Sequence, residues 1–454
     1  MTVHFIAIGG SVMHQLAIAL KKKGYKVTGS DDEIFEPARG NLEQEGLLPA
    51  FIGWYPEKIN AGLDAVILGM HARGDNPELL RAQELNLKIY SFPAYIYEES
   101  RQKTRVVVGG SHGKTTTTSM IMHVLQKLGK QFDYLVGAKV EGFSQSVNIT
   151  DAPLIVCEGD EYPASTLERR PKFHFFFPHV AILTGIAWDH INVFPTFELY
   201  LAQFATFIRK IEKGGILIYN ETDPQLRELV KEMDIARSTG YGIPEHWVEE
   251  GTTWVRLEGV TGKLKIFGNH NLLNMHAAFL ACAELGIAAA DFVKAMESFK
   301  GASKRLELLA EGNTFRMYRD FAHAPSKVKA TIEAVKQQFP SRKLIALIEL
   351  HTYSSLNAEF LEQYRGVADA ADQAAVYYSD HALAIKKMPP IAKEQVAHGF
   401  AKEGLKVINN RQELEEWLEQ QDYSNSNLLL MSSGNFEGLD LTTFAGKIAS
   451  NLGD

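Results

Sequence analysis

The segment from Val106 to Thr118, VVVGGSHGKTTTT, has the residue types and the spacing needed to hold a phosphate. A short β-branched run enters a glycine-rich turn, and a Lys-Thr pair and a helix-forming stretch follow. Glycines let backbone N–H groups crowd around an anion, and the positive end of the following helix favours negative charge. Lys114 can reach a terminal phosphate, and the Thr115 hydroxyl can hold Mg²⁺. We expect nucleotide contacts from the whole turn, namely Gly110, Ser111, His112, Gly113, Lys114, Thr115 and Thr116.

This turn departs from the general P-loop pattern G-x-x-x-x-G-K-[ST], because position 108 is valine rather than glycine. The spacing therefore indicates a nucleoside triphosphatase of a particular subclass. One alternative stays open, a glycine-rich strand-to-helix turn without a ligand. Gly-Lys-Thr after a strand rarely arises without phosphate, which favours the phosphate site.

Two further sets of side chains follow predicted strands of the same region. EGDE (158–161) ends one strand, and Glu158 is suited to hold the metal of a P-loop site. WDH (188–190) follows the next strand, where His190 could bind a second metal while Asp189 orients it. Ligands of open α/β sheets bind beyond the carboxyl ends of the strands. We therefore expect Lys114, Glu158 and His190 to be the catalytic residues, with Mg²⁺ on Thr115, Glu158 and His190.

A second glycine turn lies near the N-terminus. Gly9-Gly10-Ser11 follows a strand-like run, and Ser30-Asp31-Asp32 comes about twenty residues later, which partly matches a dinucleotide fingerprint. The chain lacks G-x-G-x-x-G and has His14 where the last glycine belongs. A nicotinamide dehydrogenase is therefore a weak alternative, whereas another diphosphate can still bind at this turn.

Two residues in the last third of the chain each have two possible roles. Asp320, at the end of a predicted strand, can accept hydrogen bonds from ribose hydroxyls or can cap the following helix. Arg305, beside Lys304, can clamp a phosphate in a bidentate manner or form a surface salt bridge.

The composition describes an ordinary globular chain. The 454 residues are 45% hydrophobic and carry a net charge of −8, which disfavours a nucleic-acid partner. Two cysteines favour a reducing cytoplasm. Neither a signal peptide nor a membrane-spanning apolar run is evident.

Alternating strand and helix patterns predict a three-domain α/β protein. Strand, glycine turn, helix and strand follow one another in residues 3–29, and a second unit starts near Thr104 with a strand and its glycine turn. A third unit starts near Ala302, with predicted strands separated by helices. We expect domains at 1–102, 103–301 and 302–454. The first and third would be Rossmann-like, and the central one a P-loop domain with a mainly parallel sheet. The stretch 268–287 reads as an amphipathic helix.

Five motifs, in order, resemble the Mur ligase family over nearly the whole chain. GSHGKTTTT is similar to the shortened P-loop of that family, which accounts for Val108, and EGDE and WDH are similar to its metal motifs. GNHNLLNMHAA (268–278) resembles its adenine-side helix, and DFAHAP (320–325) its ribose-side motif.

The resemblance implies a cytoplasmic ATP-dependent amide ligase of cell-wall precursor synthesis, monomeric or weakly dimeric. The carboxylate of UDP-N-acetylmuramate would attack the γ-phosphorus of ATP, and an amine would then displace phosphate from the acyl phosphate. Asn271 and Asn274 would lie near the adenine, Asp320 near the ribose, and Arg305 near ATP. The first domain would bind UDP with Gly10, Ser11, Asp31 and His71.

Two branches of the family use UDP-N-acetylmuramate as the acceptor. One adds L-alanine to its carboxylate, and the other adds the tripeptide L-alanyl-γ-D-glutamyl-meso-diaminopimelate. The segments at 27–37, 73–77, 160–173 and 431–438, and the single histidine in His323-Ala324, look more like the tripeptide branch. Residues that read the amine would lie near 351–355 or 432–436. A P-loop ATPase without ligase activity is the remoter alternative.

Overall fold

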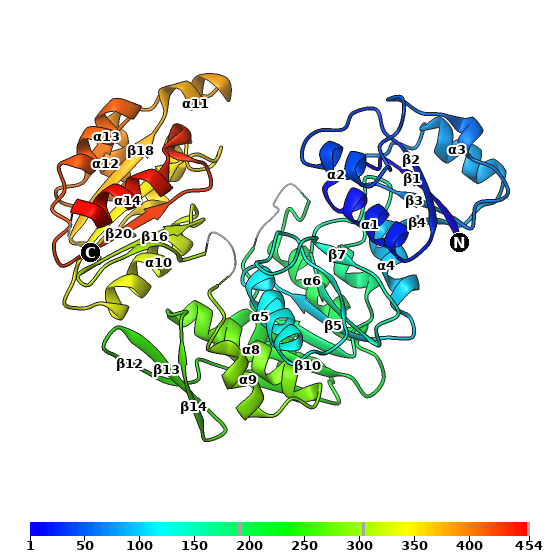
Figure 1. The fold of residues 1–454 in the computed structure, drawn as a ribbon, viewed down its shortest axis with the longest axis horizontal. Helices are drawn as coiled ribbons and strands as arrows, with labels where there is room; N and C mark the ends of the chain where they lie inside the picture. Colours follow the sequence, from blue (N-terminus) through cyan, green and yellow to red (C-terminus); the bar gives the residue numbers. More distant parts are fainter. Residues whose placement is uncertain (189–192, 302–304, 452–454) are drawn as a thin grey trace. The chain divides into compact units, whose positions relative to one another are not determined.

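A computed structural model describes residues 1–188, 193–301 and 305–451. Their contacts divide the chain into two compact units, one of Met1–Pro244 with Leu273–Met296 and one of Glu245–Leu272 with Glu297–Asp454. Figure 1 shows the elements of each, with the first unit in blue to green and the second ending in red. Within the described residues, none of the helices combines the length and apolarity needed to cross a bilayer.

The first unit begins with a four-stranded parallel sheet in the order β2-β1-β3-β4. Helices cover both faces, because one core includes side chains of α1 and α4 and another includes those of α3. The elements are β1 (Thr2–Ile6), α1 (Ser11–Lys22), β2 (Lys26–Ser30), α2 (Ala38–Gln44), β3 (Ala65–Leu68), α3 (Pro77–Glu84), β4 (Ile89–Ser91) and α4 (Phe92–Ser100).

The second sheet of this unit has seven strands in the order β11-β10-β9-β5-β8-β6-β7, parallel except for β7. Its central strands are short apolar runs, as expected where both faces of a parallel sheet are covered. The elements are β5 (Thr104–Gly109), α5 (Lys114–Lys127), β6 (Asp133–Leu135), β7 (Val147–Asn148), β8 (Leu154–Glu158), β9 (Val180–Leu183), α6 (Phe197–Arg209), β10 (Ile216–Asn220), α7 (Pro224–Glu232), β11 (Ser238–Tyr241), α8 (Asn269–Glu284) and α9 (Ala289–Met296). Helix α8 belongs to this unit from Leu273 onward, and its first residues belong to the second unit.

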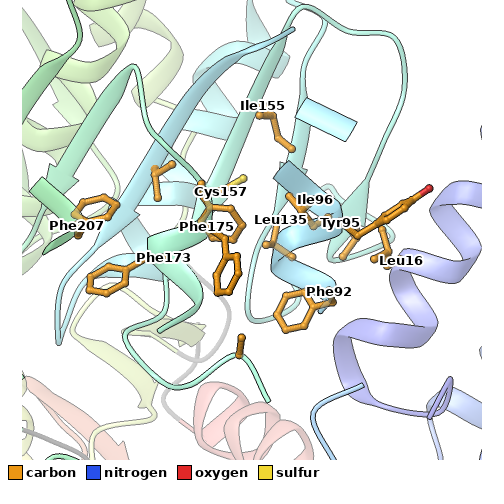
Figure 2. Close-up of a cluster of buried hydrophobic side chains, with 14 of the residues drawn as sticks. Leu16, Phe92, Tyr95, Ile96, Leu135, Ile155, Cys157, Phe173, Phe175 and Phe207 are labelled. Atoms are coloured by element: carbon orange, nitrogen blue, oxygen red, sulfur yellow. The ribbon is translucent and has the colours of Figure 1, made fainter. Parts of the chain in front are cut away.

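One hydrophobic core joins these two sheets. It combines Leu16, Phe92 and Tyr95 from the N-terminal helices with Leu135 and Phe173 from the larger sheet, and Figure 2 shows these side chains lying together. Apolar burial of this kind stabilises a domain by about 25 cal/mol per Å². The shared core therefore fixes the N-terminal sheet against the P-loop sheet.

The second unit contains a three-stranded antiparallel sheet and a six-stranded sheet in the order β15-β16-β20-β17-β18-β19, parallel except for β15. Helices α10 and α12 pack on one face of the larger sheet, and α13 and α14 pack on the other. The elements are β12 (Glu245–Glu249), β13 (Thr252–Leu257), β14 (Val260–Leu264), β15 (Glu307–Glu311), β16 (Phe315–Asp320), α10 (Pro325–Gln338), β17 (Lys343–Leu350), β18 (Gln373–Tyr378), α11 (Asp380–Ile385), α12 (Lys393–Phe400), β19 (Lys406–Ile408), α13 (Arg411–Glu419), β20 (Ser426–Met431) and α14 (Leu441–Asn451).

Candidate active site

The predicted phosphate turn connects β5, the middle strand of the larger sheet, to α5. Gly110 has φ +126° and Gly113 has φ +84°, values that only glycine adopts without strain. A Cβ on Gly113 would also overlap Oδ1 of Asn274, on α8. The turn therefore has the backbone conformation and the helix N-terminus that an anion site needs.

Gly113→Ala is expected to weaken ATP binding by about tenfold or more, because a left-handed alanine costs about 1–2 kcal/mol and its methyl displaces Asn274. Gly129→Ala is the matched control, since Gly129 also has positive φ but nothing lies within 4 Å of its Cβ position. Calorimetric titration with ATP measures both variants. If Gly113→Ala binds ATP as the wild type does, the turn does not hold the nucleotide.

Lys114 is the first residue of α5, and its ammonium group is held on two sides. Its Nζ donates to the Gly110 carbonyl oxygen at 2.6 Å and to Glu161 Oε2 at 2.7 Å. Tyr200 on α6 donates to the other oxygen of Glu161 at 3.2 Å, and its hydroxyl lies 2.8 Å from Ser111 Oγ. Glu161 and Tyr200 were not among the predicted site residues. Glu161 closes the EGDE motif, of which only Glu158 was expected to act, and no motif includes Tyr200.

Glu158 ends β8, which pairs directly with β5. Its Oε1 accepts from Thr115 Oγ1 at 3.0 Å, and its Oε2 accepts from the Gly137 N–H at 2.9 Å. Burial raises the pKa of Glu158, although these hydrogen bonds and Lys114 oppose the shift. A half-buried carboxylate beside a hydroxyl is a fitting pair of hard oxygen donors for Mg²⁺, which typically takes one or two carboxylates and keeps waters or phosphates as its other ligands.

The described residues contain no cluster of three or more His, Cys, Asp or Glu side chains arranged for a metal. His190 and Asp189 lie outside the described residues, so the predicted second metal ligand stays a prediction. The segment before them follows β9 on the other side of β5. Its Thr184 donates to the His112 carbonyl oxygen, and the Ala187 N–H donates to Ser111 Oγ at 2.8 Å.

The remaining predicted ATP residues lie on α8 and in the second unit. Asn271 donates its side-chain amide to the Phe267 carbonyl oxygen at 2.9 Å. Asp320 is 3% exposed, and its oxygens accept the N–H groups of Leu306 and Ala322, both at 2.7 Å. It therefore secures two loops rather than capping α10, whose N-cap is Ala324.

Arg305 lies close to Asp320 in this unit. Its guanidinium stands 5.4 Å from the centre of the Phe321 ring. Burial raises the pKa of Asp320, and Arg305 lowers it in part. Burial and, to a smaller extent, the same cation lower the pKa of His270 to about 4, so this histidine is neutral at pH 7.

Carboxylates also gather at the carboxyl ends of β17, β20 and β18 in the second unit. Glu349 is 3% exposed and accepts from Ser432 Oγ and from the Phe436 N–H. Glu437 accepts from Tyr377 and Ser379. A cavity of about 560 Å³ follows β18 and is lined by acidic, basic and amide side chains, among them Asp380, Lys393, Glu394 and Asn409.

The N-terminal sheet carries the second candidate site, a cavity of about 990 Å³. It is lined by the predicted UDP residues Gly10, Ser11, Asp31 and His71. Asp31 Oδ2 accepts from the Gly9 N–H at 2.6 Å, which closes the glycine turn at the start of α1. The structure thus brings together four residues that lie up to 61 positions apart in the sequence.

Burial raises the pKa of Asp31 to about 6, Asp32 adds to the rise, and hydrogen bonds from Gly9 and Glu33 oppose it. The native chain then keeps this proton at a higher pH than the unfolded chain, whose aspartate has a pKa of about 3.9. We expect the stability contribution of Asp31 to be lost as pH rises from about 4 to about 6.

Urea unfolding of the wild type and of Asp31→Asn at several pH values measures this effect. The variant should gain on the order of 1–3 kcal/mol relative to the wild type between about pH 4 and about pH 7. A difference that does not change with pH would contradict the raised pKa.

The family models that match this chain are the Mur ligase family catalytic domain over residues 2–104, the Mur ligase middle domain over 108–282 and the Mur ligase glutamate ligase domain over 304–434. These matches confirm the predicted three-domain α/β class.

Two curated relatives carry different names. UDP-N-acetylmuramate–L-alanine ligase of Carboxydothermus hydrogenoformans is 30% identical over 451 residues, which are 96% of this chain and 94% of the relative. UDP-N-acetylmuramate–L-alanyl-γ-D-glutamyl-meso-2,6-diaminoheptandioate ligase of Haemophilus influenzae is 30% identical over 358 residues, 76% and 79% of the two chains.

A solved structure, the UDP-N-acetylmuramate-alanine ligase MurC from Thermotoga maritima, has the same fold with a TM-score of 0.67 and 22% identity, covering 100% of this chain and 99% of that one. The chain therefore belongs to the Mur ligase family of ATP-dependent ligases.

Proposed function

We propose that this ligase joins L-alanyl-γ-D-glutamyl-meso-diaminopimelate to the lactoyl carboxylate of UDP-N-acetylmuramate and produces ADP and phosphate. In this proposal residues 1–102 bind the UDP sugar, 103–301 bind ATP and 302–454 bind the peptide. Two free, buried cysteines suit a cytoplasmic location. The observation that carries the proposal is the lysine of the glycine turn beside two acidic residues, Glu158 and the buried Glu161, at the carboxyl edge of the same sheet.

Phosphoryl transfer requires alignment and neutralisation of charge more than covalent help from the protein. The N–H groups at the start of α5 and the Lys114 ammonium would hold the phosphates of ATP. Lys114 already has a carboxylate partner in Glu161, so ATP binding would exchange that contact for phosphate oxygens. Thr115 and Glu158 would hold Mg²⁺, which supplies positive charge to the phosphates when it is bound.

In the first step the lactoyl carboxylate attacks the γ-phosphorus, the bond to the β-phosphate oxygen breaks, and an acyl phosphate and ADP form. In the second step the peptide amine attacks the acyl carbon, loses a proton and expels phosphate. Asn274, packed against Gly113, would keep the turn in place beneath the nucleotide. Asn271, Arg305 and Asp320 would contribute from α8 and the third domain to the adenine and ribose side.

The second unit supports a peptide as the amine. A cavity of about 560 Å³ is much larger than L-alanine requires, and its mixed acidic and basic lining suits a zwitterion such as diaminopimelate. L-alanine is the second candidate. It is favoured by the relative that matches over 96% of this chain, which is named as an L-alanine ligase.

ADP release in the presence of ATP, Mg²⁺ and UDP-N-acetylmuramate tests the proposal when each amine is added separately. We expect kcat/KM to be at least about 100-fold higher with the tripeptide than with L-alanine, because the buried polar groups of a site built for the peptide stay unpaired with the smaller amine. Preference for L-alanine would reverse the assignment. ADP release that needs neither acceptor nor amine would instead identify an ATPase.

A further inference from the structure

Lys172, which lies between strands β8 and β9 of the larger sheet, places its ammonium group at the edge of the N-terminal cavity. Among the described residues that line this cavity, it is the one that lies beyond residue 102. It begins a short 3-10 helix, Lys172–Phe175, whose Phe173 is buried in the core shared by the two sheets. Figure 2 shows Phe173 and Phe92 from the two sides of that core. The backbone beneath Lys172 is therefore fixed with respect to both sheets.

The ammonium group of Lys172 is oriented by three neighbours. Nζ lies 2.6 Å from Asp160 Oδ2, and it stands 6.0 Å and 5.7 Å from the ring centres of Phe92 and Tyr162. The side chain is only 16% exposed. The Asp160 carboxylate and the Lys172 ammonium therefore form an ion pair at the edge of the cavity. An ammonium has three donors, and this arrangement leaves it able to bind a second anion.

The charged side chains that line the cavity are mostly acidic, and Lys172 is one of the few cations among its described residues. Five acidic side chains line it, Asp31, Asp32, Glu33, Glu36 and Asp75. Arg73 and Lys172 are the lysine and arginine side chains among its described lining residues. A ligand with a diphosphate at one end and a carboxylate at the other therefore needs both the α1 N-terminus and these cations to offset the acidic surroundings.

Lys172 and Lys114 form ion pairs with two residues that are adjacent in the sequence. Lys172 pairs with Asp160, and Lys114 of the phosphate turn pairs with Glu161. One short segment thus connects the edge of the UDP cavity to the place where the γ-phosphate is expected. For reaction, the lactoyl carboxylate has to approach the γ-phosphorus to roughly 3–3.5 Å. The diphosphate, in contrast, is expected at the Gly9-Gly10-Ser11 turn.

From this geometry we propose that Lys172, oriented by Asp160, binds the lactoyl carboxylate of UDP-N-acetylmuramate and directs it toward ATP. The inference rests on the proposed function, because it assumes that this sugar nucleotide occupies the cavity. It assigns a substrate-binding role to Lys172, which the sequence indicated only as part of the segment 160–173.

UDP-N-acetylglucosamine is the decisive probe, because it carries the same diphosphate and sugar but lacks the lactoyl carboxylate. Calorimetric titration of the full chain with both sugar nucleotides compares the wild type with Lys172→Met. We expect the variant to lose about tenfold or more in affinity for UDP-N-acetylmuramate, as for loss of a hydrogen bond to a charged group, and to bind UDP-N-acetylglucosamine as the wild type does. Lys172→Arg should recover most of the lost affinity.

Lys210→Met is the matched control, because Lys210 also places its ammonium near an aromatic ring, 4.6 Å from the centre of Phe177, but does not line the cavity. Asp160→Asn should raise KM for UDP-N-acetylmuramate while leaving KM for ATP unchanged, which a purely structural role would not produce.

Unchanged binding of UDP-N-acetylmuramate by a folded Lys172→Met overturns the inference and leaves the proposed function standing. Equal losses for both sugar nucleotides place the lysine on the diphosphate and also overturn it. If the wild type itself does not bind UDP-N-acetylmuramate, the proposed function fails. Should Lys172→Met not fold, Lys172→Gln provides the same comparison.

Discussion

Replacing Lys114 with methionine is expected to lower kcat for ligation by about 10³-fold or more, the scale seen when a cation that stabilises phosphoryl transfer is removed. Lys114 Nζ lies within 2.7 Å of both the Gly110 carbonyl oxygen and Glu161. No other described side chain of the turn carries a permanent positive charge. Steady-state ADP release with all substrates measures the loss.

Stability must be separated from catalysis in this experiment. Glu161 is 1% exposed, so removing its cation leaves an uncompensated buried charge that costs about 3–5 kcal/mol. The double variant Lys114→Met with Glu161→Gln removes both charges and should recover stability without recovering activity. Lys127→Met, on the exposed end of α5, is the control for the loss of a lysine from this helix. Activity near that of the wild type in a folded Lys114 variant would remove the lysine from the reaction.

Glu158→Gln should have the second largest effect, a decrease in kcat on the order of 10²–10³-fold with a higher Mg²⁺ requirement, because the amide cannot supply a negative ligand. The same substitution should not lower the stability of the protein, although it lowers activity. Burial raises the pKa of Glu158, which means that the protein disfavours its charge in the absence of a cation. The neutral, isosteric glutamine can still accept from the Gly137 N–H. We therefore expect the unfolding free energy without Mg²⁺ to stay the same or to rise.

Magnesium titration of activity and thermal unfolding, both with and without Mg²⁺, measure the two effects on one preparation. Glu141→Gln, at an exposed position of the same domain, is the control. A Glu158→Gln enzyme with an unchanged Mg²⁺ titration would exclude this carboxylate from the metal site.

The elements that position the turn were predictable because their patterns are local. Strands β5, β8 and β9 are apolar runs typical of buried parallel strands, and the glycine turn directly follows β5. The three-stranded sheet β12–β14 was not predicted. Its residues alternate between buried and exposed, and β12 is largely exposed, so the apolar signal is weak.

The partners of the predicted residues could not be read from the sequence. Lys114 and Glu161 are 47 residues apart, and Glu161 and Tyr200 are 39 apart, so only the order of the strands brings them together. Asp320 illustrates a different limit. Its position at the end of β16 indicated either a ribose contact, which stays a prediction, or a helix cap, which is wrong. The carboxylate accepts instead from the N–H groups of Leu306 and Ala322. A local pattern identifies a polar residue at a strand end but does not specify which groups it meets.

The central claim is that the phosphate turn transfers the γ-phosphoryl group of ATP to the carboxylate of UDP-N-acetylmuramate. The most direct test follows a carboxylate oxygen of that sugar nucleotide into the released phosphate. The sugar nucleotide is labelled with ¹⁸O in its lactoyl carboxylate, the amine and ATP are added, and the released phosphate is analysed by mass spectrometry. An acyl phosphate requires one labelled oxygen to appear in that phosphate, and Lys114→Met should abolish its formation. Product formed with unlabelled phosphate would contradict the account.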